Sequence, residues 1–223
     1  MSAPSDAGDA GNKGEAPAES AAPPAVLTRR TLTYHLLCTT AKVGSRTVFP
    51  TRYEGREHLP AEGPLVLCSN HQSYLDIPLI AAGVRRHVSF VARDTLARSP
   101  LLARIMDRCG AVLVRRGASD HGALKEMVAH LAEGDCLCIF PEGTRTKDGS
   151  IGEFRRGALL AARRGRAPVV PVAITGSFEA WPPGRSLPRP HGVTIRFGEP
   201  VDPRGRDALE IVAGRVADLA AAR

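Results

Sequence analysis

The 223-residue chain has few aromatic side chains and no long apolar run, and both shortages limit what it can be. Aromatic residues make up 4% of the sequence, and no recognised nucleic-acid motif is present, so we expect no stacking surface for bases and no nucleic-acid partner. No stretch approaches the roughly 18 to 20 apolar residues that span a bilayer. The nearest candidate, residues 26–49, is interrupted by basic side chains, so it can lie on a membrane but hardly cross one.

Cysteine is scarce and its spacing excludes two common uses. The chain has five cysteines, an odd count with no C-x-x-C pair: Cys38, Cys68, Cys109, Cys136 and Cys138. A disulfide framework or a zinc site would need paired, closely spaced cysteines. We therefore expect no metal, and we interpret these residues as small core side chains of a protein facing the cytoplasm.

Lysine is also rare, because four of the 30 basic residues are lysine and the others are arginine. Guanidinium groups suit partners rich in phosphate, such as lipid headgroups or nucleic acid. Base-composition bias explains the same preference, so the formal net charge of +7 identifies no partner by itself.

Composition divides the chain into three parts. Residues 1–25 contain no aromatic and hardly any large apolar side chain, which predicts a disordered tail. They also lack the basic start and apolar stretch of a signal peptide. Residues 26–50 read as an amphipathic helical segment suited to a membrane surface, and residues 51–223 as one folded domain.

Short apolar runs alternate with helical patterns through this domain. We predict strands near residues 64–69, 88–92, 111–114, 136–140, 169–174 and 193–197, the last near a sheet edge. We predict helices near residues 77–82, 95–108, 120–133, 154–164 and 206–222, and a loop at 176–192. The alternation indicates an α/β fold, a single domain with a twisted, largely parallel or mixed sheet flanked by helices.

The stretch from Asn70 to Asp76 follows a predicted strand and holds a candidate acid–base pair. His71 can take a proton near neutral pH, and the Asp76 carboxylate can fix its tautomer. The two can meet if His71 lies in the loop and Asp76 caps the next helix, whose Pro78 suits a first turn. The same residues also fit a capped helix preceded by an ordinary loop histidine.

Two further polar stretches follow predicted strands, where sites gather in open α/β sheets. Phe140 to Arg145 (FPEGTR) offers backbone N–H groups, a hydroxyl and a forked cation that can hold a phosphate. Arg115 and Arg116 can grip the same anion. Each stretch alone also fits a solvated turn.

Together these stretches resemble the glycerolipid acyltransferases, especially 1-acylglycerol-3-phosphate acyltransferases. The family's ordered blocks correspond to Asn70–Asp76 (N-H-x4-D), Gly110–Arg116, Phe140–Arg145 (F-P-E-G-T-R) and Val170–Val172 (V-P-V). The likeness spans about residues 55–198, with one departure: many members have Asp-Arg where this chain has Arg115-Arg116.

The resemblance implies an enzyme in which His71 acts as general base, oriented by Asp76. Arg116 and Arg145 would bind the acceptor phosphate, with Glu142, Gly143 and Thr144 shaping its pocket. Acyl-CoA or acyl-carrier protein would donate the acyl chain to a lysophospholipid, without metal or other cofactor. The protein would act at the cytoplasmic face of the membrane, as a peripheral or monotopic protein.

Other acceptors share the same blocks, among them glycerol 3-phosphate, other lysophospholipids and lyso-aminolipids. A non-catalytic phospholipid-binding module with the same fold is the main alternative from another class. A serine hydrolase is disfavoured because the chain has no G-x-S-x-G sequence. The segment Thr95–Arg108 combines apolar and basic residues, and fits either a membrane-surface or acyl-tunnel helix or an ordinary core-facing helix.

Overall fold

The computed structural model describes residues 31–93, 99–114 and 120–222. Its strands are β1 (Thr51–Glu54), β2 (Leu65–Ser69), β3 (Val88–Arg93), β4 (Val112–Val114), β5 (Cys136–Ile139), β6 (Val169–Thr175) and β7 (Val193–Phe197). Its helices are α1 (Leu32–Thr47), α2 (Asp76–Gly83), α3 (Pro100–Arg108), α4 (Asp120–Ala132), α5 (Gly157–Arg164), α6 (Ser177–Ala180) and α7 (Ala208–Ala221), with a 3-10 turn at Arg56–His58. Strands and helices therefore alternate as the sequence pattern predicts.

The strands form one seven-stranded sheet in the order β1-β7-β6-β2-β5-β3-β4. Every neighbouring pair is parallel except β6 and β7, which are antiparallel. The predicted fold class, a single α/β domain with a mixed sheet flanked by helices, is confirmed. Because β2 lies between β6 and β5, the loop after β2 is adjacent to the loops that follow both neighbours.

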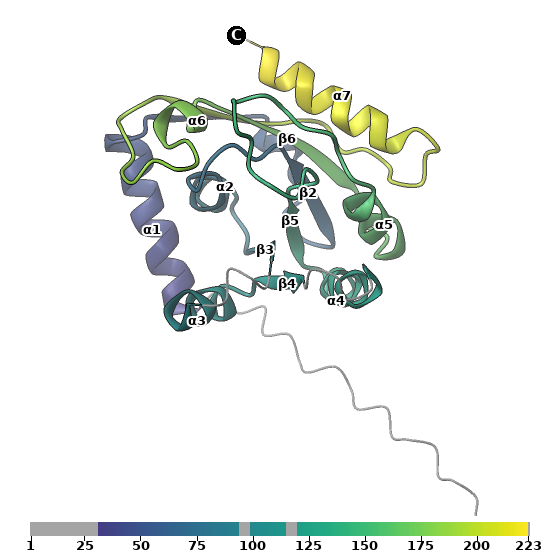
Figure 1. Cartoon of the computed structure of the whole chain (residues 1–223). Helices are drawn as coiled ribbons and strands as arrows, with labels where there is room; N and C mark the ends of the chain where they lie inside the picture. The colour runs from purple at the N-terminus through teal and green to yellow at the C-terminus, as the bar shows by residue number, and fades with distance from the viewer. Residues whose placement is uncertain (1–30, 94–98, 115–119, 223) are drawn as a thin grey trace, which may run out of the picture.

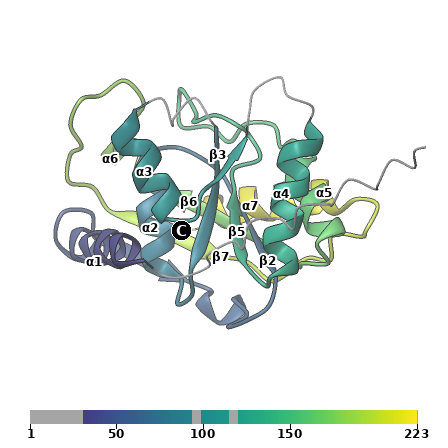
Figure 2. The same cartoon turned by 90° about the horizontal axis from the view of Figure 1, so that it is seen from below.

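Side chains of the central strands alternate between two apolar layers. In β2, Val66 and Cys68 join the layer under α4, α5 and α7, whereas Leu65 and Leu67 join the layer under α2 and α6. Helices cover both faces of the sheet, with α1 beside α2 and α3 near the start of α1 (Figures 1 and 2). A strand buried on both faces reads as a continuous apolar run, which is why β2 was predictable.

The structure agrees with the strand predicted near a sheet edge and departs from the predicted elements at two other points. Strand β7 lies next to the edge, between β6 and the edge strand β1. Strand β1 was not predicted, because its four residues include one large apolar side chain, Tyr53. Helix α5 starts at Gly157 rather than Phe154, because the Arg155 N–H donates to the Pro141 carbonyl and draws this stretch toward the loop after β5.

The cysteines divide into a buried and a partly exposed set. Cys68, Cys136 and Cys138 are buried in the sheet, as expected for core residues, whereas Cys38 and Cys109 are only partly buried. Burial raises the pKa of the Cys68 and Cys136 thiols to about 12. These two thiols are therefore protonated and unreactive at neutral pH.

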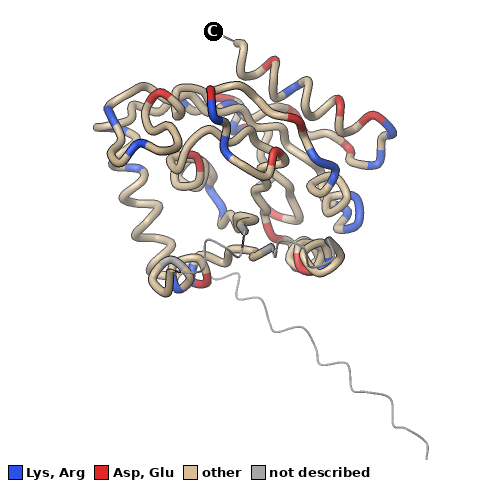
Figure 3. The backbone as a smooth tube through the Cα atoms, in the orientation of Figure 1, with Lys and Arg blue, Asp and Glu red and all other residues tan. Residues whose placement is uncertain are grey.

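Helix α1 overlaps the predicted N-terminal segment, of which residues 26–30 lie outside the described residues. It exposes Leu32, Leu36 and Val43 to solvent. Figure 3 shows few charged residues along α1, whereas acidic and basic residues are interspersed along much of the remaining chain. In the ranges that the structure describes, no helix combines the length and the apolar character that crossing a bilayer requires.

Candidate functional site

Three loops meet at the carboxyl ends of the parallel strands β2, β5 and β6. They carry His71 after β2, Glu142 after β5 and Ser177 after β6. The Thr146 N–H donates to the His71 carbonyl at 2.9 Å and so connects the loop after β5 to the loop after β2. Arg116, predicted to bind phosphate, lies outside the described residues.

His71 and Asp76 contact each other directly. Nδ1 of His71 lies 2.8 Å from Oδ2 of Asp76. The spacing of five residues closes because His71 stands in the loop while Asp76 is the first residue of α2. The Asp76 side chain is fully buried, whereas 15% of the His71 side chain is exposed. The ring of Phe140 stacks on the imidazole, with centroids 3.9 Å apart, so the histidine is held at its edge and on one face.

Three hydrogen-bond donors and the Nδ1 atom of His71 surround the Asp76 carboxylate. The N–H groups of Gln72 and Ser73 donate to Oδ2 at 2.7 and 2.8 Å, and the Ser177 hydroxyl donates to Oδ1 at 2.7 Å. An ionised carboxylate can only accept hydrogen bonds, as Asp76 does here from these three donors. His71 must therefore donate from Nδ1, and its Nε2 carries the lone pair that can take a proton.

The start of α2 differs from the predicted cap. Leu75 occupies the N-cap position and makes no side-chain cap hydrogen bond, while Asp76 is already helical. The Asp76 side chain reaches back to the N–H groups of the loop before the helix instead. Pro78 lies in the first turn, as predicted.

Glu142 links three segments of the chain. Its Oε1 accepts the His71 N–H at 2.8 Å, and its Oε2 accepts the Gly152 N–H at 3.0 Å. The residue is 7% exposed. Burial raises the pKa of the Glu142 carboxyl, and the two N–H groups oppose that rise. Its predicted part in the acceptor pocket stays a prediction.

The Arg145 guanidinium lies over the ring of Tyr74, a residue between His71 and Asp76 in the chain. Its Cζ is 3.5 Å from the Tyr74 ring centroid, and Trp181 packs on the same ring at 5.4 Å. Its Nη1 is buried and has no hydrogen-bond partner among the described residues. The turn before it depends on Gly143, whose φ of 68° suits glycine.

A hollow of about 1070 Å³ lies beside this loop. Glu142, Thr144 and Arg145 line one side of it, and Leu209 and Ala213 of α7 line another. Three of the predicted substrate-binding residues thus share one cavity wall. In the described part of the chain, no group of three or more His, Cys, Asp or Glu side chains is placed to hold a metal ion.

Two residues without a predicted role, Asn70 and Ser177, complete the site. The Asn70 side chain exchanges two hydrogen bonds with the backbone of Ile174, at 2.9 and 2.8 Å, and so continues the pairing of β2 with β6. Ser177 belongs to α6, a short helix within the predicted loop 176–192. No pattern links Ser177 to Asp76, because 101 positions separate them.

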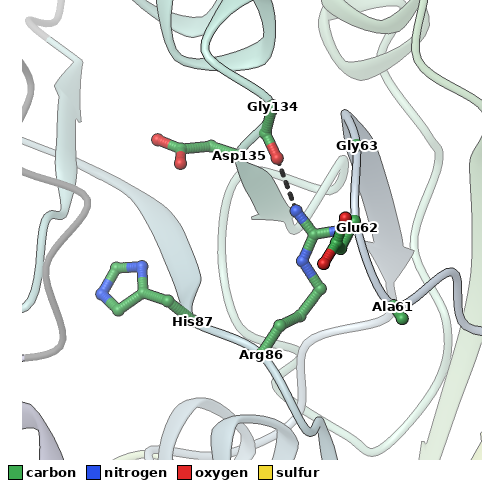
Figure 4. Close-up of a pocket in the computed structure, with 7 residues that line it drawn as sticks. All are labelled: Ala61, Glu62, Gly63, Arg86, His87, Gly134 and Asp135. Atoms are coloured by element: carbon green, nitrogen blue, oxygen red, sulfur yellow. Dashed lines mark hydrogen bonds between the residues drawn. The ribbon is translucent and has the colours of Figure 1, made fainter.

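A second His–Asp pair with the same spacing lies at the opposite ends of the strands. Nδ1 of His130, in α4, is 2.8 Å from Oδ2 of Asp135, just before β5, and both side chains are buried. Figure 4 shows Asp135 in a hollow with Arg86, which donates to the Gly134 carbonyl. This pair connects the end of α4 to the start of β5. The loops after β2, β5 and β6, which surround His71 and Asp76, do not surround it.

Known proteins resemble this chain in sequence and in fold. The family model described as "Acyltransferase" matches residues 50–175. The crystal structure of the 1-acyl-sn-glycerophosphate (LPA) acyltransferase, PlsC, from Thermotoga maritima superimposes with a TM-score of 0.71 at 30% identity, covering 86% of this chain and 82% of that one. More than half of the chain matches the family model, and the chain therefore belongs to the Acyltransferase family.

Curated relatives carry related names. The 1-acyl-sn-glycerol-3-phosphate acyltransferase LPAT1, chloroplastic, of Arabidopsis thaliana is 32% identical over 76% of this chain and 48% of its own length. The 1-acyl-sn-glycerol-3-phosphate acyltransferase of Bacillus subtilis is 27% identical over 66% of this chain and 71% of its own. The lyso-ornithine lipid O-acyltransferase of Pseudomonas aeruginosa is 30% identical over 66% and 63%. The chain spans about half the length of the plant relatives it matches.

Proposed function

We propose that the protein moves a fatty acyl chain from an acyl thioester, acyl-CoA or acyl-carrier protein, to the free hydroxyl of a lysophospholipid. The proposed acceptor is 1-acylglycerol 3-phosphate and the product phosphatidic acid. The main supporting observation is the 2.8 Å contact between His71 and a buried Asp76, which leaves Nε2 of the histidine for the acceptor hydroxyl. The names of the Arabidopsis and Bacillus relatives support the choice of acceptor.

In this mechanism His71 acts as the general base. Nε2 takes the proton of the acceptor hydroxyl while its oxygen attacks the thioester carbonyl carbon. The Asp76 carboxylate stabilises the imidazolium through Nδ1. When the carbon–sulfur bond breaks, the thiolate takes the proton from the imidazolium and leaves as a thiol. The chain's own residues supply the acid–base chemistry, and no covalent acyl-enzyme forms.

Arg145 is the proposed contact for the acceptor phosphate. Its guanidinium is held against Tyr74, and the buried Nη1 is a donor without a partner in the described residues. Buried N–H donors are normally satisfied, and a phosphate oxygen is a strong acceptor for an arginine. The Thr146 N–H bond to the His71 carbonyl keeps this loop beside the base.

We also propose that the protein works at the cytoplasmic face of a membrane as a peripheral or monotopic protein. Helix α1 supports this proposal, because its exposed leucines are accompanied by Lys42 and Arg46 and by no acidic residue. Apolar and basic side chains on one helix favour binding to an anionic lipid surface. The acceptor and the product are both lipids, so such a position would bring the site to its substrate.

The general-base proposal is tested with two matched histidine variants. His71→Ala should lower kcat for acyl transfer from oleoyl-CoA to 1-acylglycerol 3-phosphate by at least about 100-fold, the scale of general-base catalysis. His130→Ala removes a histidine from the other pair of the same spacing and should leave kcat within about twofold, since it contacts no proposed reacting group. Equal activity of His71→Ala and the unaltered protein would reject the base.

The acceptor is tested by a panel measured with purified protein and mass spectrometry of the products. The lyso-ornithine lipid O-acyltransferase relative makes a lyso-aminolipid the second candidate. Arg145→Ala should raise KM for 1-acylglycerol 3-phosphate about tenfold or more, the cost of a lost charge-assisted contact, and should spare an acceptor without phosphate. Phospholipid binding without any acyl transfer in the panel would favour the non-catalytic alternative.

A further inference from the structure

We infer that Ser177 is a positioning residue for the proposed acyl transfer, acting through Asp76 on the orientation of His71. The inference rests on the proposed function and adds a third member, from the short helix α6, to the His71–Asp76 pair. It assigns a role to a residue outside the Asn70–Asp76 and Phe140–Arg145 stretches. The observation behind it is the hydrogen bond of 2.7 Å from the Ser177 hydroxyl to Oδ1 of Asp76.

The two oxygens of Asp76 have different environments. Oδ2 accepts from the Gln72 and Ser73 N–H groups and faces the His71 ring, all within 2.8 Å. Oδ1 accepts the hydrogen bond of the Ser177 hydroxyl. A buried carboxylate with one oxygen unsatisfied is costly, so the serine stabilises both the charge and its orientation.

The single Ser177 proton can serve one acceptor. The hydroxyl is 2.7 Å from Oδ1 of Asp76 and 3.5 Å from Oε1 of Gln72. The shorter contact lies at the usual O–H···O distance, and the longer one lies outside it. The hydroxyl therefore donates to Asp76. Ser177 is 0% exposed, so water does not compete with Asp76 for the Ser177 hydroxyl.

The backbone holds Ser177 in place through the residue before it. Gly176 has a φ of 84°, and a Cβ there would come within 2.1 Å of the Gly192 carbonyl oxygen. The chain can therefore leave β6 and turn into α6 only with glycine at this point. The Ser177 hydroxyl is presented to the β2 loop by a turn that has little freedom.

Loss of the hydroxyl would remove this donor from Oδ1 of Asp76, while the Gln72 and Ser73 N–H groups would still hold Oδ2. The carboxylate could then turn part of the way about its terminal torsion, which has broad preferences, and the contact of Oδ2 with Nδ1 of His71 would loosen. The fraction of His71 with a lone pair on Nε2 facing the acceptor would fall. This predicts a loss of turnover that depends on Asp76, rather than a loss of folded protein.

The test is a double-mutant cycle on the full chain. Ser177→Ala should lower kcat about tenfold, the scale of one hydrogen bond to a charged group. In the Asp76→Asn background the same change should alter kcat by less than about twofold, because the group it acts through is gone. Ser89→Ala is the matched control: Ser89 is buried in β3 and its hydroxyl has no partner among the described residues. It should leave kcat unchanged.

A second measurement does not depend on activity. The Nδ1 proton of His71, identified by its loss in His71→Ala, should shift or broaden in the NMR spectrum of Ser177→Ala, while that of His130 stays in place. An unchanged His71 signal, an unchanged kcat, or an equal tenfold loss in the Asp76→Asn background would each overturn the inference. If the unaltered protein transfers no acyl group, the proposed function fails, and the NMR signal still decides whether Ser177 positions His71.

Discussion

At the scale of single residues, the site depends on carboxylates that are buried and hydrogen-bonded. Asp76 and Glu142 are both buried, and each accepts backbone N–H groups from the loop that contains or adjoins His71. A buried carboxylate must be satisfied at both oxygens, because an unmet acceptor costs more than an extra hydrogen bond gains. These two side chains therefore determine the path of the loops and also place negative charge beside His71.

Glu142→Gln is a sharp test of this reading. An amide has one acceptor oxygen, so its NH2 group would face the N–H of either His71 or Gly152, which both donate to Glu142 now. We expect a loss of about 1.5 to 3 kcal/mol in the free energy of unfolding and about a tenfold lower kcat. Urea unfolding and the acyltransfer assay measure the two effects.

The control for Glu142→Gln is Glu153→Gln. Glu153 lines the same hollow but is exposed, so its substitution should change stability by no more than about 0.5 kcal/mol. If both substitutions have the same small effect on unfolding and on kcat, Glu142 does not hold the two loops. If Glu142→Gln raises KM for the acceptor alone, its predicted place in the acceptor pocket is favoured instead.

At the scale of elements, the ends of β2, β5 and β6 bring the site together. Asn70 extends the pairing of β2 with β6, and the Thr146 N–H joins the loops after β2 and β5. Each connection uses backbone groups that a strand end would otherwise leave unpaired. The site is therefore rigid where the strands end, although no single element contains it.

Gly176→Ala tests how strongly the end of β6 is constrained. The added Cβ would meet the Gly192 carbonyl and would require alanine at a φ of 84°. We expect a loss of about 2 to 4 kcal/mol in stability and a parallel loss of kcat, as Ser177 is displaced. Gly184→Ala separates the effect of the positive φ from that of the steric contact. Gly184 has a φ of 88°, and a Cβ added there would have no atom within 4 Å. Urea unfolding should find it destabilised by only about 1 kcal/mol. Equal losses would show that contact with Gly192 is unimportant.

At the scale of the whole molecule, α1 lies on the opposite face of the sheet from α5 and α7 (Figure 1). It exposes Leu32, Leu36, Leu37 and Val43 and contains basic but no acidic residues. Charges elsewhere are interspersed, so the arginine-rich composition alone defines no membrane-facing surface (Figure 3). The orientation at a membrane would follow from α1.

Substitution of Leu32 and Leu36 together by serine tests that orientation. Burying two leucines at a lipid interface is worth a few kcal/mol at most, so we expect binding to phosphatidylglycerol vesicles to weaken about tenfold or more. Vesicle sedimentation measures the bound fraction. Leu160→Ser, on α5, is the control, because this exposed residue lies on the opposite side of the sheet. Equal binding of both variants and the unaltered protein would contradict a lipid contact through α1.

The sequence by itself determined the elements and the chemical groups of the site. Runs buried on both faces of the sheet, such as β2 and β5, are apolar except for Ser69 at the end of β2, and local composition therefore indicates them directly. His71 and Asp76 were recognisable because they lie five positions apart in a distinctive block, and FPEGTR was recognisable as a whole. The edge strand β1 was not predicted, because its three half-buried residues and one exposed residue have little periodicity.

Only the tertiary structure decided which residues act together. His71–Asp76 and His130–Asp135 have the same spacing, and they differ because one pair lies where β2, β5 and β6 end and the other lies at the opposite ends of the strands. Ser177 reaches Asp76 from 101 positions away because β6 is next to β2. Such contacts depend on strand order and on buried groups finding partners across the sheet, and neither is recorded in local composition.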